Sequence, residues 1–327
     1  MKRYRRLMVL SLLAAFILPA AASAQQELAQ RCANIPVDPT RRFCNLVAQA
    51  IETGQPRIGL VLAGGNPLSG AASTLGMRIG KLPRFSAAAR ITGAKLDVPD
   101  IQDFNGSGDL DAFLPALSVD ASVGLLTGFD IMPTVGGFLS VDLVASIGTV
   151  AIPEDDGFET GRVNSWAAGA RIGLLRESFT VPGLSVTAMY RAFNDVSFGS
   201  RQLTSDDAYY ESSNFHAWSL RGVVGKRIVS VGASAGLGYD RYSSDVAFGV
   251  SNPGVVPPAR FDLREDGFTT SRTSAFGSAH WTLLIVSVVG ELGWQFGGES
   301  LAAPLPAGRS GRDSGAFFGT LAVRVSI

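Results

Sequence analysis

The sequence predicts an all-β protein, a transmembrane antiparallel up-and-down β-barrel of about 12 strands preceded by a short periplasmic helical segment. Two observations lead to this prediction. From residue 57 onward, apolar and polar residues alternate in one segment after another, each close to the roughly 9–11 residues that cross a bilayer as a tilted strand. The connections between segments are alternately short and long, as in up-and-down barrels.

The composition agrees with this class and argues against others. Of 327 residues, 46% are hydrophobic and only 17% are charged, against about 25% charged in ordinary soluble domains. Basic and acidic side chains number 28 each, and 24 basic ones remain without Lys2, Arg3, Arg5 and Arg6 of the leader. No nucleic-acid partner is therefore expected. Two His and two Cys leave few ligands for a metal centre of those residue types.

Residues 1–24 have the three parts of a signal peptide. A basic start, Lys2 to Arg6, precedes an apolar run from Leu7 to Leu18, and Ala22-Ser23-Ala24 is a small-x-small cleavage site. The apolar run is too short to anchor the chain as a membrane helix. We therefore expect an exported chain that begins at Gln25.

Residues 25–56 are expected to form a periplasmic N-terminal segment. Cys32 and Cys44 are the only cysteines, and an oxidising compartment favours a disulfide between them. Apolar residues at helical spacing from Phe43 to Ile51 predict a short helix that ends near Gly54. This segment either clips the N-terminus in place or enters the barrel as a plug. We favour the clip, because one short helix fills little of a lumen.

Residues 57–327 are expected to form the barrel. The alternation is clear in the last segment, where Leu321, Val323 and Val325 are apolar and Thr320 and Arg324 are polar. About 12 segments follow this pattern; they are Arg57–Ala63, Thr74–Lys81, Phe85–Leu96, Ala116–Leu125, Phe138–Thr149, Ser165–Leu175, Leu184–Phe193, Phe215–Gly225, Ile228–Tyr239, Ser274–Trp281, Val286–Phe296 and Phe317–Ile327. Because the number of predicted strands is even, both ends of the barrel chain are expected in the periplasm.

With its signal peptide, its alternating segments and its terminal strand Leu321 to Ile327, the chain resembles the bacterial outer-membrane β-barrel superfamily, in a porin-like form. The side chains Trp166, Tyr190, Trp218, Trp281 and Trp294 lie near predicted strand ends, as an aromatic girdle requires. The resemblance implies a location in the outer membrane, lipid and lipopolysaccharide around the barrel, and insertion by the barrel assembly machinery. Ile327 departs from the aromatic residue with which such chains usually finish. A soluble β-sandwich is the alternative fold.

Charged side chains on the lumen side of the alternation are the candidate functional residues. Charges at membrane depth must pair or meet water. They either set the selectivity of a passage or neutralise one another in a closed lumen. The predicted set is Arg78, Arg90, Asp120, Asp142, Arg171, Arg191, Arg221, Glu291 and Arg324.

One connection resembles the beginning of a calcium loop. Asp103, Asn105, Ser107, Asp109 and Asp111 place oxygen donors at alternate positions. The twelfth position is Leu114 rather than the bidentate Glu. A turn rich in Gly and Asp is the competing interpretation, and no other cofactor is expected.

No enzymatic activity is expected. A barrel lipase needs adjacent Ser and His on the lipid side, whereas the alternation turns Ser278 and His280 inward. Asp206 and Asp207 lie near His216 in sequence, as a rim protease would require, but proximity in a loop is weak support.

The function we expect is a passive channel or a transporter of small solutes with a charged lumen. The alternative is a non-conducting structural or adhesion barrel that binds partners through its outer loops, especially residues 196–213 and 242–267.

Overall fold

A computed structural model describes the chain at residues 28, 30–77, 82–99, 109–131, 136–152, 161–198, 208–252, 259–298 and 315–327. The predicted signal peptide lies outside the described residues. A helical turn at residues 30–33 precedes helix α3 (Asp38–Ala63), and the strands follow it. The strands are β1 (Phe85–Pro99), β2 (Asp109–Leu126), β3 (Ser140–Ala151), β4 (Arg162–Leu175), β5 (Gly183–Phe193), β6 (Val196–Phe198), β7 (Ala208–Ile228), β8 (Val231–Asn252), β9 (Ala259–Leu283), β10 (Val286–Gln295) and β11 (Ala316–Ser326).

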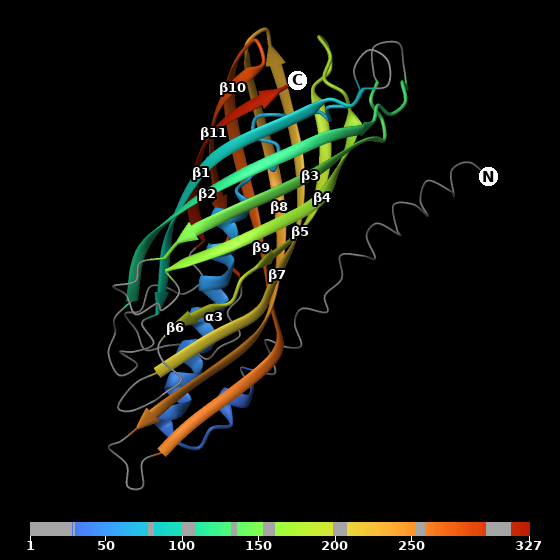
Figure 1. Ribbon diagram of the computed structural model, residues 1–327. Helices are drawn as coiled ribbons and strands as arrows, with labels where there is room; N and C mark the ends of the chain where they lie inside the picture. The colour runs from blue at the N-terminus through green and yellow to red at the C-terminus, as the bar shows by residue number, and fades with distance from the viewer. Residues whose placement is uncertain are drawn as a thin grey trace, which may run out of the picture.

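The strands form one antiparallel sheet in the order β5-β4-β3-β2-β1-β11-β10-β9-β8-β7-β6. β5 also pairs with β7, so the sheet closes into a barrel of ten strands. The short β6 stands outside this ring and pairs with the outer part of β7. The all-β antiparallel barrel is therefore confirmed (Figure 1).

The predicted count of about 12 strands is wrong, because the described residues of the first two predicted segments form no strand of the sheet. Arg57–Ala63 is the last part of α3, and the described part of Thr74–Lys81 contains no strand. A short apolar run such as residues 58–62 does not distinguish a strand from a fully buried helix. Each of the other ten predicted segments overlaps one strand of the ring, and β7, β8 and β9 extend well beyond the predicted bounds.

The outer surface of the ring is apolar. Ile91, Ile147 and Leu321, from three different strands, are all more than half exposed. Trp166, Tyr190 and Trp218 lie side by side on the outside, with ring centroids 5.9 Å and 5.2 Å apart along the row. An apolar band bordered by aromatic rings is the lipid-facing surface of a membrane barrel. Within the described residues, no helix is both long and apolar enough to cross a bilayer.

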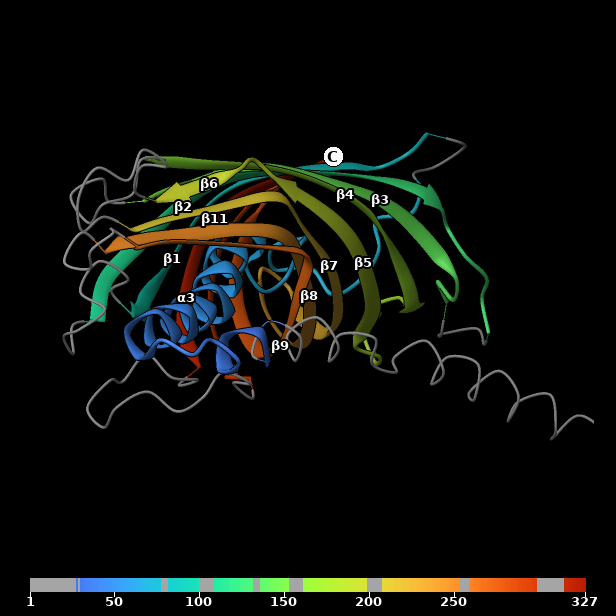
Figure 2. The same cartoon turned by 90° about the horizontal axis from the view of Figure 1, so that it is seen from below.

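The two ends of the barrel differ. At the turn end, two-residue turns join β7 to β8 and β9 to β10, and β1 begins beside the end of β11. At the loop end, β7, β8 and β9 continue beyond the other strands (Figure 1). Seen along the barrel, α3 lies within the curve of the strands (Figure 2).

Candidate functional site in the barrel lumen

Helix α3 enters the barrel from the loop end. Its first half packs on the extended strands, where the ring of Phe43 lies 6.3 Å from that of Phe248 on β8. Its last carbonyls, at Leu62 and Ala63, accept hydrogen bonds from Arg90 on β1. The helix ends at Ala63, and Gly64 follows it with a positive φ of 61°, which suits a glycine. It is therefore a lumen helix, much longer than the short helix predicted to end near Gly54.

The second half of α3 is enclosed on all sides. Leu60, Val61 and Leu62 have 0% exposure each, although successive helix residues point about 100° apart. They belong to a cluster with wall residues such as Leu96 on β1, Phe215 on β7 and Phe318 on β11. The void beside Ala63 has a volume of about 10 Å³, which is room for about one water molecule. At Leu60 to Leu62 the wall therefore packs directly on the helix.

Beyond the helix, residues 64–76 continue through the lumen toward the turn end; we call them the lumen segment. Most of the predicted lumen charges contact its backbone. Arg90 joins the helix to the wall: it bonds the final helix carbonyls and pairs with Asp120 on β2 at 3.2 Å. A cation at a helix C-terminus also interacts favourably with the helix dipole.

Two further arginines bond backbone carbonyls of the lumen segment. Arg221 on β7 donates from Nε to the Gly65 carbonyl at 3.1 Å and pairs with Asp240 on β8 at 2.9 Å. Arg171 on β4 donates to the Asn66 side chain at 2.6 Å and to the Ala71 carbonyl at 3.2 Å. These buried cations therefore serve as fixed hydrogen-bond donors.

Two carboxylates accept from N–H groups of the same segment. Glu291 on β10 accepts from Gly65 at 2.9 Å and from Asn66 at 3.1 Å. Asp142 on β3 accepts from Leu75 at 2.7 Å and from Gly76 at 3.3 Å. Backbone groups that would be costly to bury unpaired are satisfied by the wall.

Of the remaining predicted lumen residues, one bonds the lumen segment and another bonds the wall. Arg324 on β11 donates to the Ser69 carbonyl at 2.5 Å, and Arg191 on β5 donates to Ser165 at 2.9 Å. Arg78 lies outside the described residues. The other eight predicted residues are all buried. Their role in selectivity stays a prediction.

Three contributors were not predicted. Asp240 lies one residue beyond the segment predicted for β8, and the same alternation continued by one step would have placed it inside. Gln55 donates to Ser244 at 2.7 Å, and Arg57 donates to the Gly315 carbonyl at 2.7 Å. Both lie on α3, and no sequence signal marks them because their region had been assigned in part to a strand.

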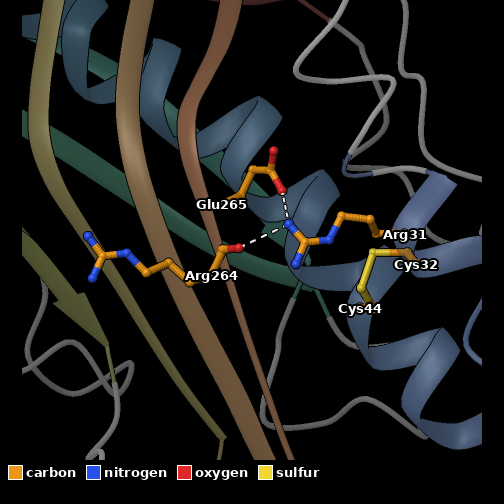
Figure 3. The surroundings of a disulfide bond; sticks show 5 residues. All are labelled: Arg31, Cys32, Cys44, Arg264 and Glu265. Carbon is orange, nitrogen blue, oxygen red and sulfur yellow. Dashed lines mark hydrogen bonds and ion pairs between the residues drawn. A yellow bond between two sulfur atoms is a disulfide. The ribbon is translucent and has the colours of Figure 1, made fainter.

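The predicted disulfide between Cys32 and Cys44 is present, and it lies at the loop end (Figure 3). Beside it, Arg31 pairs with Glu265 at 2.5 Å and donates to the Arg264 carbonyl at 3.1 Å, both on β9. The interpretation of this region as a clip rather than a plug is wrong. Its helix is long enough to reach the middle of the lumen, and its disulfide lies at the end opposite the two-residue turns.

The calcium-loop prediction stays untested. Asp103, Asn105 and Ser107, and the side chain of Asp109, lie outside the described residues. Asp111 on β2 pairs with Lys95 on β1 at 2.9 Å. In the described part of the chain, no three His, Cys, Asp or Glu side chains gather as metal ligands would.

The geometry gives no support to a catalytic site at the residues considered. Ser278 is hydrogen-bonded to Ser234 at 2.7 Å rather than to a histidine. His216 contacts the carbonyl of Asn214 at 2.7 Å. Asp206 and Asp207 lie outside the described residues. Among the described residues of this set, no nucleophile is hydrogen-bonded to a base.

Comparison with solved structures finds outer-membrane β-barrels at low sequence identity. The translocator domain of the autotransporter NalP from Neisseria meningitidis matches 85% of this chain and 96% of its own, at 11% identity and a TM-score of 0.37. The COG4313 outer membrane channel from Pseudomonas putida F1 matches 77% and 97%, at 8% identity and 0.34. Ail, the attachment invasion locus protein of Yersinia pestis, matches 75% and 98%, at 7% identity and 0.28.

The fold is that of a bacterial outer-membrane β-barrel. The apolar band, the aromatic row and the closed antiparallel ring carry this conclusion. No protein-family model matches the sequence, and no curated protein does. The likenesses to solved structures concern the fold alone.

Proposed function

We propose that this outer-membrane barrel is closed to passive diffusion and that it presents a binding surface outside the cell. The observation that carries the proposal is the complete burial of Leu60, Val61 and Leu62 inside the ring. A passive channel needs a continuous water-filled path. Here the corresponding space holds a helix and a hydrogen-bonded segment of the same chain, so solutes pass only if these move.

The binding surface that we propose is the loop end, which we call the outer platform: residues 30–51 together with 208–214, 244–252 and 259–268 of β7, β8 and β9. The helix and the extended strands share an apolar cluster that includes Phe43, Val47, Phe248 and Phe268. This cluster gives the platform a packed interior of its own. A rigid scaffold that holds loops in place is a common arrangement for binding.

The assignment of sides rests on the turns. In barrels of this class the short turns face the periplasm and the long connections face outward. The platform also carries charged side chains on its outer surface, among them the pair Arg264 and Asp266, which suits water rather than lipid. The platform therefore lies above the bilayer, and the N-terminal segment lies outside the cell rather than in the periplasm. Contact with lipopolysaccharide and insertion by the barrel assembly machinery belong to the same proposal and rest on the resemblance to barrels of this class.

The experiment that tests the sidedness is epitope exposure on intact cells. A short tag after Asn34, an exposed residue beside the disulfide, should be stained by an antibody without permeabilisation. The matched control is the same tag after Phe179, which is 98% exposed in the turn between β4 and β5. That tag should be stained only after the outer membrane is permeabilised. The reverse pattern would contradict the proposal.

A further inference from the structure

A cavity of about 770 Å³ opens at the turn end of the lumen, at the opposite end from the outer platform. Residues 70–75 of the lumen segment form part of its lining, together with His280 on β9 and Arg324 on β11. The proposed function does not use this cavity. Its size is that of a pocket for a small molecule.

The cavity gathers positive charge. Four arginines line it, and Glu177 is the one acidic side chain among the described lining residues; the arginines are Arg84, Arg176, Arg227 and Arg324. Glu177 accepts from the backbone N–H of Arg227. The exposed Arg227 guanidinium has no hydrogen bond or ion pair within the described residues. Like charges in a concave site attract an anion from solution.

Two buried groups in this cavity have unused hydrogen-bonding capacity. His280 and Arg324 are each 7% exposed. Within the described residues, Nδ1 of His280 and Nε of Arg324 have no hydrogen-bond partner. Buried polar atoms are normally paired, so these atoms point to a missing partner.

The lining is held in place by bonds between the turns and the lumen segment. Lys226 donates to the Phe179 carbonyl at 2.8 Å, which ties the β7–β8 hairpin to the turn before β5. The N–H of Glu177 donates to Ser73 at 2.8 Å, and Arg84 donates to the Leu75 carbonyl at 3.4 Å. The cavity is therefore a formed site rather than a gap between independent loops.

We propose that this cavity binds an anion that carries a phosphate group, which is either free in the periplasm or part of an anionic lipid headgroup. Guanidinium groups suit phosphate because their planar N–H forks match its oxygens. Arg227 is the group that would contact the ligand from the rim, with Arg324 beneath it. This inference takes the sidedness of the barrel from the proposed function, but it does not depend on a closed lumen or on binding by the outer platform.

The test is isothermal titration calorimetry of the full mature chain in a neutral detergent at low salt. One arm uses inorganic phosphate and the other uses micelles doped with phosphatidylglycerol. We expect saturable binding in at least one arm, and the arm that binds identifies the source of the phosphate group. Arg227→Gln should lower the binding affinity on the order of tenfold, because one charge-assisted contact is lost.

The matched control is Arg162→Gln, which removes the same charge from an exposed position at the loop end of β4. It should leave the affinity unchanged. The folding of each variant is checked by its heat-dependent migration on gels, and Arg176→Gln replaces Arg227→Gln if the latter does not fold. Absence of binding in both arms, or equal weakening by the rim and control variants, would overturn the proposal.

Discussion

Helix α3 and the lumen segment occupy the same barrel but are held in different ways. The second half of α3 is surrounded by apolar wall residues such as Leu96, Phe215 and Phe318. The lumen segment has no regular structure, and its backbone is bonded by buried charges such as Arg171, Arg221 and Glu291. A helix satisfies its own backbone and needs only apolar packing, whereas an irregular segment needs donors and acceptors from the wall.

This difference assigns a structural role to the lumen charges. A charge that bonds a buried backbone group is costly to remove, because its partner is then left unpaired. Charges of this kind hold a segment in place. The same side chains would serve in selectivity only in a barrel from which the segment had been withdrawn.

The largest expected effect comes from an unpaired charge in the helix. Leu60→Asp places a carboxylate in an enclosed apolar cluster, at a cost of about 3–5 kcal/mol. We expect α3 to leave the lumen, or the barrel to unfold at a lower temperature in heat-dependent gel migration. Arg42→Asp, at an exposed position of the same helix, is the control and should have little effect. A Leu60→Asp barrel as stable as the parent would show that α3 is not tightly packed.

The disulfide tests the outer end of α3. The two cysteines are 12 residues apart in sequence, and closing so short a loop stabilises by about 3 kcal/mol. In a Cys32→Ser and Cys44→Ser double variant, we expect protease to cut residues 30–51 faster while the ring keeps its unfolding temperature. If residues 30–51 became easier to cut and the ring also unfolded at a lower temperature, the platform and the ring would unfold as one unit.

A smaller effect is expected for the lumen segment. Glu291→Gln keeps the size of the side chain but leaves one of two backbone donors, at Gly65 or Asn66, without an acceptor. The expected loss is about 1–3 kcal/mol. Hydrogen exchange at these two amides should accelerate, while exchange in α3 should change little. Asp266→Asn, an exposed pair partner on β9, should change neither.

The smallest effect is expected at Asp245 on β8, in the outer platform. Hydrogen bonds from the Asn214 side chain and from the Gly267 N–H lower the pKa of Asp245. The carboxylate therefore contributes stability above its unfolded pKa, about 3.9, and this contribution is lost as pH falls through the lower folded pKa. Exchange of the Gly267 amide should accelerate over that acidic range. Asp245→Asn should abolish the pH dependence, and a pH dependence that persists in the variant would assign it to another group.

The ring could be predicted from sequence because it obeys one local rule. Period-two alternation, as in Leu321 to Val325, is a direct consequence of having lipid on one side and the lumen on the other. The same rule identified which charges point inward, including Arg90, Arg171 and Arg221.

The contents of the lumen could not be predicted in the same way. Ile58 to Leu62 is a helix buried on every side, and it has neither of the periodicities that separate helix from strand. The wall bonds the lumen segment mainly through its backbone. The residue types at 64–76 therefore do not indicate which wall residues bond them. Sequence alone therefore located the charges but not what they bind.

The central claim is that the intact barrel is closed by its own N-terminal chain, and single-channel recording in a planar bilayer tests it most directly. The full mature chain, inserted and folded, should pass no steady current. Leu60→Asp should produce open events if the helix is displaced from a ring that remains folded. A steady current from the parent chain, unchanged in this variant, would contradict the account.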